Sequence, residues 1–319
     1  MDQANVVFFG SGSLGVPCLQ ELARRGCIDV VVSQPDRPAG RGRVSTPTPI
    51  SVAALECGLK LIRTDNANQL ETRDQCARAK VIVVIAFGQK LLPELIADRV
   101  AINLHPSALP KWRGAAPIQR AMMAGEQRIT ACAMAVAERM DAGAIYARHN
   151  FELGATETAG ELHDRIARDS VEMMLQTIER ARVGAIIGQE QIDAHATRAM
   201  KLSKSEAYVD FAQPAQLVRC RIHGLAPWPG CDAEISGEPI RLLRVREVSV
   251  NGAALSAAPS ANLPGEILQG GFVACGVGAI EIMQVQPVGG RAMAWQDFCR
   301  GRSIQMGQRM TSAPRKEQT

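Results

Sequence analysis

Short apolar runs that alternate with helical patterns dominate the first third of the chain. The runs occupy residues 5–9 (NVVFF), 28–33 (IDVVVS), 81–88 (VIVVIAFG) and 100–105 (VAINLH). They are rich in β-branched residues and lack polar alternation, which is typical of strands buried on both faces. Between the first two runs, residues 16–26 carry apolar side chains at helical spacing and end in glycine. This alternation predicts an α/β fold with a parallel sheet covered by helices.

The middle of the chain is less regular. Residues 130–153 predict two strands around a turn at 141–143, and Thr158 with Glu161 forms the T-x-x-E pattern of a capping box before a helix with one apolar stripe. Residues 34–49 (QPDRPAGRGRVSTPTP) contain so much proline and glycine that they predict no regular structure. Residues 184–205 show weak periodicity and predict a link between two halves of the chain.

After Tyr208 the pattern changes to short strands separated by glycine-rich turns. Residues 214–224 predict a helix, and the segments 231–248 and 265–287 contain closely spaced apolar runs. This spacing predicts a small antiparallel barrel or sandwich. The residues after Met310 (TSAPRKEQT) are polar, and we expect them to fray.

Composition excludes several classes of protein. The 319 residues contain no apolar stretch long enough for a membrane span, and the first residues lack the basic start of a signal peptide, so we expect a cytoplasmic protein. The nine cysteines form no C-x-x-C pair, so we expect reduced, mostly buried thiols and no metal site. A net charge of +4 does not by itself indicate a polyanionic partner.

A glycine-rich turn, GSGSLG at 10–15, follows the first apolar run. Gly10, Gly12 and Gly15 match the dinucleotide fingerprint, and Asp36 lies at a suitable distance further on. Asp36, however, falls within the Pro/Gly segment, and nothing downstream resembles hydride chemistry. We therefore interpret the glycines as a tight strand-to-helix turn that allows close backbone approach.

The run at 100–105 carries the most informative polar residues. Asn103 and His105 are two residues apart and so point to the same side of a strand. They lie at its carboxyl end, where open α/β sheets bind ligands. An amide and an imidazolium can stabilise the oxyanion of an acyl-transfer reaction, each lowering the barrier by roughly 3 kcal/mol. A carboxylate near the imidazole would complete the set, and Asp141 in the predicted turn is the candidate.

Three arginines, Arg37, Arg41 and Arg43, lie in the Pro/Gly segment. They form either a solvated connection or a basic loop that reaches a phosphate backbone, and composition alone does not decide between these readings.

Several longer runs resemble one family. They are QPDRPAGRGR (34–43), VIAFGQKLLP (84–93), INLHPSALPKWRGAAPIQRAMMAGE (102–126), MDAG (140–143), KLSKSEAYVDF (201–211) and APWPG (226–230). The chain resembles the methionyl-tRNA formyltransferase family of the folate-dependent formyltransferase superfamily. The N-x-H and Asp set is common to that superfamily, whereas the loop, KLSK and PWP runs are similar to the tRNA-directed members.

The resemblance assigns roles to particular residues. It implies that Asn103, His105 and Asp141 are catalytic and that the S-x-L-P stretch contacts folate. The members of that stretch are Ser107, Ala108, Leu109 and Pro110. It also implies that the loop at 34–50 reaches the acceptor end of the tRNA, with Arg37, Arg41 and Arg43 binding tRNA and Arg41 as the important cation. Ala108 replaces a usual leucine, and ERMDAG replaces the more usual G-L-D-T-G turn.

The resemblance also implies an overall organisation and a reaction. A Rossmann-like, parallel-sheet formyltransferase domain (1–188) would be joined by a linker (189–205) to an OB-like barrel that binds tRNA (206–310), with a polar tail (311–319). The expected enzyme is a cytoplasmic monomer, without metal, that moves formyl from 10-formyltetrahydrofolate to initiator Met-tRNA in translation initiation. The alternatives are a formyltransferase for a small amine such as an amino sugar, and an NAD-linked or non-enzymatic Rossmann protein.

Overall fold

The structure is a computed structural model that describes residues 6–39, 42, 44–248 and 262–312. By contacts the chain divides into two compact units that do not follow sequence order. The N-terminal unit comprises Met1–Gly114, Ile129–Phe151 and His163–Arg198, and the C-terminal unit comprises Ala115–Arg128, Glu152–Leu162 and Ala199–Thr319. The predicted boundary at 189–205 stays a prediction.

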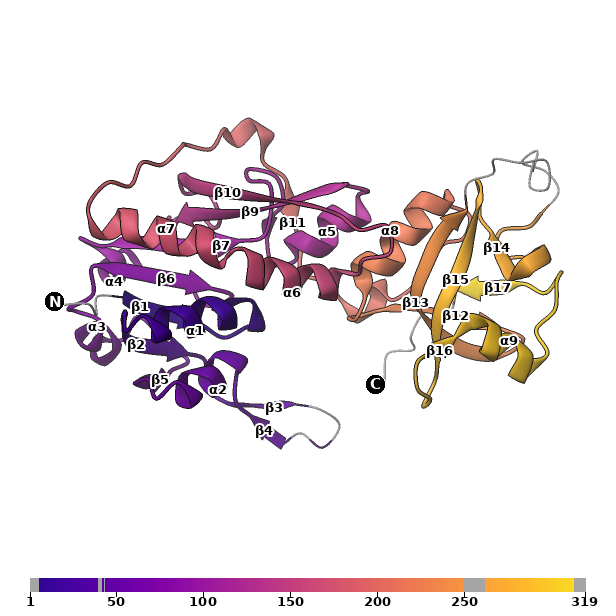
Figure 1. The fold of residues 1–319 in the computed structure, drawn as a ribbon, viewed down its shortest axis with the longest axis horizontal. Helices are drawn as coiled ribbons and strands as arrows, with labels where there is room; N and C mark the ends of the chain where they lie inside the picture. The colour runs from indigo at the N-terminus through magenta and orange to yellow at the C-terminus, as the bar shows by residue number, and fades with distance from the viewer. Residues whose placement is uncertain (1–5, 40–41, 43, 249–261, 313–319) are drawn as a thin grey trace. The chain divides into compact units, whose positions relative to one another are not determined.

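The N-terminal unit is built on a seven-stranded sheet in the order β10-β9-β7-β6-β1-β2-β5 (Figure 1). Its strands are β1 (Val6–Gly10), β2 (Ile28–Ser33), β5 (Leu61–Arg63), β6 (Val81–Ile85), β7 (Val100–His105), β9 (Arg128–Ala135) and β10 (Ile145–Glu152). Neighbouring strands in the run β5-β2-β1-β6-β7 are parallel. β9 runs antiparallel to β7. The predicted parallel sheet is confirmed, and β5 lies at its edge.

Helices cover this sheet because both of its faces are apolar. The helices of the unit are α1 (Val16–Arg24), α2 (Pro49–Glu56), α3 (Leu70–Gln75), α4 (Pro93–Ile96) and α7 (Val171–Arg182). On one face, Phe9 packs in a cluster with Leu95 of α4. On the other, the Phe8 ring lies beside Gly15 and Ile50 of α2. Alternate side chains of one strand are thus buried against different helices, as the continuous apolar run predicted.

One prediction for this unit was wrong. The Pro/Gly segment at 34–49 contains two short strands, β3 (Arg37–Ala39) and β4 (Val44–Thr46), which pair antiparallel. Pro38 is paired with Ser45 in this ladder. A two-stranded hairpin tolerates a proline because the position can be one whose N–H lies outside the ladder.

The predicted capping box is confirmed at the start of α6 (Ala159–Asp169). Thr158 N donates to the Glu161 carboxylate at 2.9 Å, and Glu161 N donates to Thr158 Oγ1 at 3.3 Å. The predicted single helix is divided at Ser170 into α6 and α7, although the backbone bonds of Ser170 to Ile166 and Met174 continue across the division.

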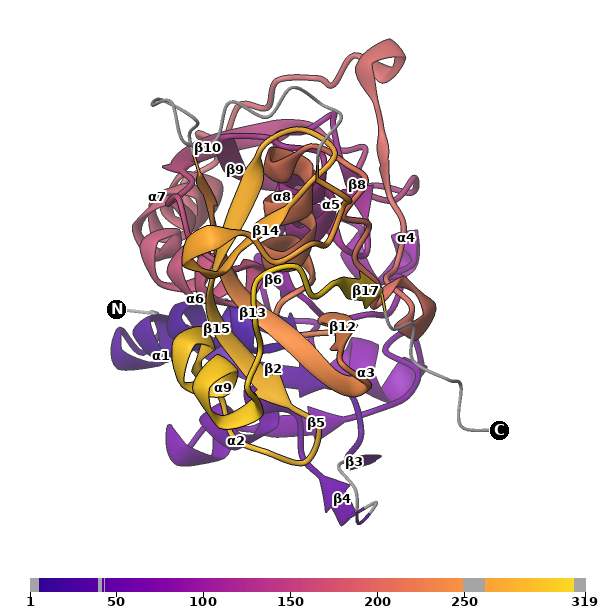
Figure 2. The ribbon, with the colours of Figure 1, turned by 90° about the vertical axis from the view of Figure 1, so that its right-hand side faces the viewer.

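The C-terminal unit contains a curled antiparallel half-barrel, which bears out the small β-domain predicted from strand spacing (Figure 2). Its strands, in the order β14-β15-β13-β12-β17 with β16 beside β15, are β12 (Cys231–Ile235), β13 (Glu238–Val248), β14 (Phe272–Ala274), β15 (Ala279–Pro287), β16 (Met293–Ala294) and β17 (Met310–Ser312). The register between β13 and β15 shifts near Leu242 to Val245. Such irregularities increase local twist and let a short sheet curl.

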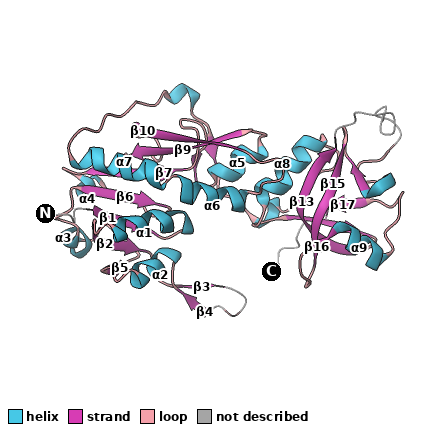
Figure 3. Cartoon of the chain, viewed as in Figure 1, coloured by secondary structure: helices cyan, strands magenta, loops and turns pink. Residues whose placement is uncertain are grey.

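Three helices belong wholly to this unit: α5 (Pro117–Met123), α8 (Ala215–Leu225) and α9 (Trp295–Arg302). Figure 3 shows the helices in cyan and the strands in magenta. Val218 and Ile222 of α8 pack against Leu242 and Ile280 of the sheet. The sequence pattern does not predict α9. Thr311 and Ser312, which are expected to fray, instead complete β17.

A last small sheet joins β8 (Arg113–Gly114) to β11 (Arg198–Ala199). Within the described ranges, every helix is too short or too polar to cross a membrane.

Candidate active site

Asn103 and His105 lie at the carboxyl end of β7, in the interior of the N-terminal sheet. β7 pairs with β6 on one side and with β9 on the other, where Asn103 is opposite Met134 and His105 is opposite Cys132. The regular strand geometry places both side chains on one face, as predicted. His105 is only 5% exposed, whereas Asn103 is half-buried and has no hydrogen-bond partner for its carboxamide among the described residues. A polar amide is thus available beside the imidazole.

Asp141 lies in the turn between β9 and β10, and the structure brings it to His105. Its Oδ1 is 3.6 Å from His105 Nδ1, while its Oδ2 accepts a hydrogen bond from Gly114 N at 2.9 Å. The side chains of His105 and Asp141 are 6% and 13% exposed. The two candidates, which lie 36 positions apart in sequence, therefore form one close pair of a buried histidine and a half-buried carboxylate.

The hydrogen bonds of His105 restrict what the ring can do. Nε2 is 3.1 Å from the carbonyl oxygen of Trp112. A carbonyl can only accept, so Nε2 carries the proton and donates. Nδ1 faces the Asp141 carboxylate at 3.6 Å, which is longer than a hydrogen bond. Nδ1 is therefore the ring atom that is not already committed to a partner within the protein.

A thiol lies close to this pair. Burial raises the pKa of Cys132, and its Sγ lies 3.1 Å from the Ser107 carbonyl oxygen, to which it donates. A buried protonated thiol is a poor nucleophile. Six of the nine cysteines are buried, which agrees with the expectation of mostly buried thiols. Groups of His, Cys, Asp and Glu able to hold a metal ion are not found within the described residues.

The S-x-L-P stretch continues from the end of β7. Ser107 Oγ donates to the Lys111 carbonyl at 2.8 Å, and Leu109 is buried in a cluster with Cys132 and Met134. Ala108 and Pro110 are half-buried. The side chains of Ser107 and Leu109 thus shape the loop from within, which leaves the half-buried Ala108 and Pro110 as the side chains of this stretch that reach solvent.

The GSGSLG turn is the tight connection that we predicted. The N–H groups of Ser11 and Gly12 both donate to the Ala86 carbonyl, at 3.2 and 3.1 Å. A Cβ on Gly12 would lie 2.9 Å from the Ala86 methyl group, so only glycine allows this approach. Asp36, the acidic residue of the apparent fingerprint, forms an ion pair with Arg63 at 3.1 Å.

The structure describes one of the three predicted tRNA-binding arginines. Arg37 begins β3 and is exposed. Arg41 and Arg43 lie outside the described residues.

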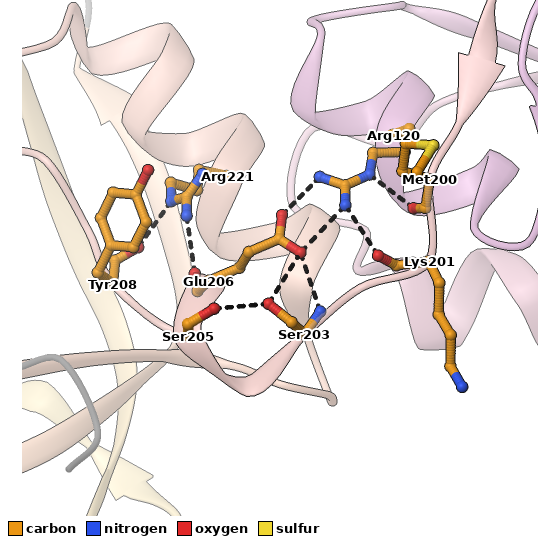
Figure 4. Close-up of polar contacts among 8 residues, drawn as sticks. All are labelled: Arg120, Met200, Lys201, Ser203, Ser205, Glu206, Tyr208 and Arg221. Carbon is orange, nitrogen blue, oxygen red and sulfur yellow. Dashed lines mark hydrogen bonds and ion pairs between the residues drawn. The ribbon is translucent and has the colours of Figure 1, made fainter. Parts of the chain in front are cut away.

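The KLSKSEA run is organised by an ion-pair network within the C-terminal unit (Figure 4). Arg120 of α5 pairs with Glu206 at 2.6 Å and also donates to the carbonyl oxygens of Met200 and Lys201. Glu206 accepts from Ser203 N at 2.9 Å. Although partial burial raises the pKa of Glu206, the bonds from Arg120 and Ser203 outweigh it and hold that pKa below its usual range. The network fixes the backbone from residue 200 to residue 206.

The resemblance points to this run but assigns no role to Arg120 and Arg221, the residues that hold it. Arg221 of α8 donates to the Glu206 and Tyr208 carbonyls at 2.7 Å each, and its guanidinium lies over the Tyr208 ring. Lys201 and Lys204 are exposed on the segment so fixed. Arg120 lies 86 positions before Glu206, so spacing along the sequence gave no signal for this pair.

Comparison with known proteins gives matches over both units. The family model described as "Formyl transferase" matches residues 4–178. The family model described as "Formyl transferase, C-terminal domain" matches residues 201–303. A methionyl-tRNA formyltransferase of Cereibacter sphaeroides is 36% identical over 97% of this chain and 99% of its own length. One from Ruegeria pomeroyi is 36% identical over 96% of this chain and 99% of its own length.

A solved structure shares the fold at low sequence identity. An N-formyltransferase from Helicobacter canadensis, in complex with folinic acid and dTDP-3-aminofucose, superposes with a TM-score of 0.64 at 13% identity, over 88% of this chain and 98% of that one. Identity at this level supports the common fold and nothing narrower.

Proposed function

The chain belongs to the methionyl-tRNA formyltransferase family, and from this premise we propose that it moves a formyl group from 10-formyltetrahydrofolate to the α-amine of initiator Met-tRNA. The observation that carries the proposal is the close His105–Asp141 pair, beside Asn103, at the carboxyl end of β7. That edge of an open α/β sheet is where ligands bind. The enzyme would act in the cytoplasm, as a monomer, in translation initiation.

The chemistry follows from the donors at this edge. The methionyl amine attacks the formyl carbon, the carbonyl π electrons move to oxygen, and a tetrahedral intermediate forms. Asn103 and the imidazolium form of His105 donate to that oxyanion. With Nε2 bonded to the Trp112 carbonyl, Nδ1–H is the imidazolium donor that remains for the oxyanion. Collapse of the intermediate breaks the bond from carbon to the folate nitrogen.

Asp141 serves the proton balance of this reaction. Its carboxylate faces His105 Nδ1 and can compensate the charge of an imidazolium. It is also placed to take the proton that the attacking amine must lose, which finally goes to the departing folate nitrogen. The Gly114 N–H holds one oxygen of the carboxylate and leaves the other toward the histidine.

Folate and tRNA would be held by separate parts of the chain. The S-x-L-P stretch, Ser107 to Pro110, directly follows the catalytic strand and is the proposed folate contact. The proposed tRNA contacts are Arg37, Arg41 and Arg43 of the loop, together with the C-terminal unit. Clustered cations neutralise phosphates, and their contribution to affinity decreases as salt concentration rises.

A small amine is the second candidate acceptor. A sugar-nucleotide complex has the same fold, as the Helicobacter canadensis enzyme illustrates. The tRNA acceptor is favoured because relatives named for it are 36% identical across both units. Activity on a free amino sugar with none on Met-tRNA would reverse the choice.

The test is transfer of labelled formyl from 10-formyltetrahydrofolate to aminoacylated initiator tRNA. Loss of one oxyanion donor lowers kcat by about 10²–10³-fold, and we expect at least that from His105→Ala. Loss of a positioned general base lowers the rate by about 10²–10⁴-fold, which is the range we expect from Asp141→Ala. The surface pair His163–Asp164, at 2.9 Å, provides matched controls. His163→Ala and Asp164→Ala should leave kcat unchanged. Near-normal turnover in the His105 and Asp141 variants would refute the site.

A further inference from the structure

Gln191 lies in the segment that sequence analysis assigned to a linker, yet its side chain is bonded to the Asp141 turn. Its Nε2 donates to the carbonyl oxygen of Asp141 at 3.0 Å and to that of Gly143 at 2.7 Å. Gln191 is half-buried, and all three residues belong to the N-terminal unit. One amide group thus bonds to the backbone on both sides of the turn.

Arg113 determines which end of the Gln191 amide faces the turn. Its Nε and Nη2 donate to Gln191 Oε1 at 3.1 and 2.8 Å, and its Nη1 donates to Asp193 at 2.9 Å. A guanidinium has no acceptor, so the oxygen of the amide must face Arg113 and the NH₂ must face the turn. The hydrogen-bond network therefore fixes the amide orientation without ambiguity.

The turn needs this support because its backbone conformation is unusual. Asp141 has φ of 55°, in the left-handed region that non-glycine residues seldom occupy. Such conformations persist where the surroundings hold them. Gly143 packs so tightly that a Cβ there would lie 2.0 Å from the Ala135 carbonyl oxygen. A turn under these constraints is sensitive to the loss of a bond that fixes it.

The same segment also holds the other partner of the catalytic pair. Thr197 Oγ1 accepts from Trp112 N at 2.9 Å, and the Thr197 carbonyl accepts from Arg113 N at 2.9 Å. The Trp112 carbonyl is the group that His105 Nε2 contacts. Residues 191–197 therefore bond to the backbone that orients His105 and to the backbone that carries Asp141.

We propose that Gln191 is a positioning residue for the formyl-transfer reaction, acting through the backbone of the Asp141 turn. The inference rests on the proposed function, because it concerns the rate of that reaction. Gln191 touches neither reacting group. Its effect is on where the Asp141 carboxylate lies relative to His105 Nδ1, and a displacement of about 1 Å in a catalytic group can lower a rate about 10²-fold.

The experiment replaces the side-chain NH₂ group of Gln191 by an oxygen. In Gln191→Glu the side chain keeps its shape and its acceptor for Arg113, but a carboxylate cannot donate to the two carbonyls of the turn. Gln189→Glu is the matched control, since Gln189 lies on the same segment and its Oε1 accepts from Arg148 at 2.8 Å. That change retains the acceptor and leaves the turn untouched. Gln191→Met removes the donors without adding charge.

Each full-length variant is assayed for transfer of formyl from 10-formyltetrahydrofolate to initiator Met-tRNA, with thermal unfolding measured alongside. We expect Gln191→Glu and Gln191→Met to lower kcat at least tenfold with KM for Met-tRNA within about twofold, and Gln189→Glu to match the wild type. A loss confined to KM or to thermal stability would indicate a structural role and overturn the inference.

Failure of the inference can be told apart from failure of the proposed function. A wild-type enzyme that formylates Met-tRNA, together with equally active Gln191 variants, overturns the positioning role alone. A wild-type enzyme that does not formylate Met-tRNA refutes the proposed function, and the inference falls with it.

Discussion

We predict that His223 makes the stability of the C-terminal unit depend on pH. The side chain is 1% exposed within that unit, and its Nε2 accepts a hydrogen bond from Val245 N at 3.1 Å. Protonation of Nε2 would place the imidazole N–H against the Val245 N–H and break this hydrogen bond. Burial, followed by the nearby Arg219 and Arg244, lowers the His223 pKa from 6.5 to about 4, although the nearby Glu161 carboxylate acts in the opposite direction.

The sign follows from which state binds the proton. Above pH 6.5 the imidazole is neutral in both the folded and the unfolded chain, so stability does not depend on it. Between pH 6.5 and pH 4 the unfolded chain takes up a proton that the folded chain does not, and the free energy of unfolding falls. The loss is about 2 kcal/mol at pH 5 and reaches about 3 kcal/mol below pH 4.

The assay is urea unfolding at pH 7 and pH 5, followed by tryptophan fluorescence. In a Trp112→Phe background the signal comes from Trp228 and Trp295, both in the C-terminal unit. His223 is the one histidine among the residues assigned to that unit. His223→Gln keeps an acceptor for the Val245 N–H but does not titrate. Between pH 7 and pH 5 its free energy of unfolding should therefore fall by about 2 kcal/mol less than that of the wild type.

The control is His195→Gln, an exposed histidine of the N-terminal unit, which should retain the wild-type dependence on pH. Equal losses between pH 7 and pH 5 in the wild type and in His223→Gln would refute the reasoning. That result would mean that the acid sensitivity arises from carboxylates alone.

Three further predictions concern other parts of the chain. Arg120→Met leaves the half-buried Glu206 carboxylate without its cation and should lower the free energy of unfolding of the C-terminal unit by about 2 kcal/mol in urea titrations; an unchanged midpoint would count against the network. Gly143→Ala would put a methyl group 2.0 Å from the Ala135 carbonyl oxygen, so kcat for formyl transfer should fall at least tenfold; full activity would show that the turn can shift harmlessly. Arg41→Ala should weaken tRNA-dependent turnover and reduce the slope of log affinity against log salt by about 1, and a slope equal to the wild type would exclude a phosphate contact.

Local pattern alone determined the elements that form the N-terminal sheet. The apolar runs at 28–33, 81–88 and 100–105 became β2, β6 and β7, because strands buried on both faces require continuous apolar side chains. The same regularity put Asn103 and His105 on one face, since side chains alternate along a strand. Where local signals conflicted, prediction failed. Proline and glycine at 34–49 concealed the β3–β4 hairpin, because a ladder of two strands is not excluded by one proline.

The turn at Asp141 and the segment around Gln191 required the tertiary structure. Asp141 lies 3.6 Å from His105 Nδ1 only because β9 returns antiparallel beside β7. Gln191 bonds to that turn from 50 positions further along the chain. Long-range pairs of this kind depend on how elements pack, which no local periodicity encodes.

The membership of the two compact units was also decided by packing. The sequence determined that a parallel α/β sheet precedes a small curled β-domain and which side chains lie at the carboxyl end of β7. Only the tertiary structure decided that Ala115–Arg128 and Glu152–Leu162 belong with the later half of the chain. The physical reason is that hydrogen bonds within helices and apolar alternation act over a few residues, whereas burial of a core joins whichever segments have complementary surfaces.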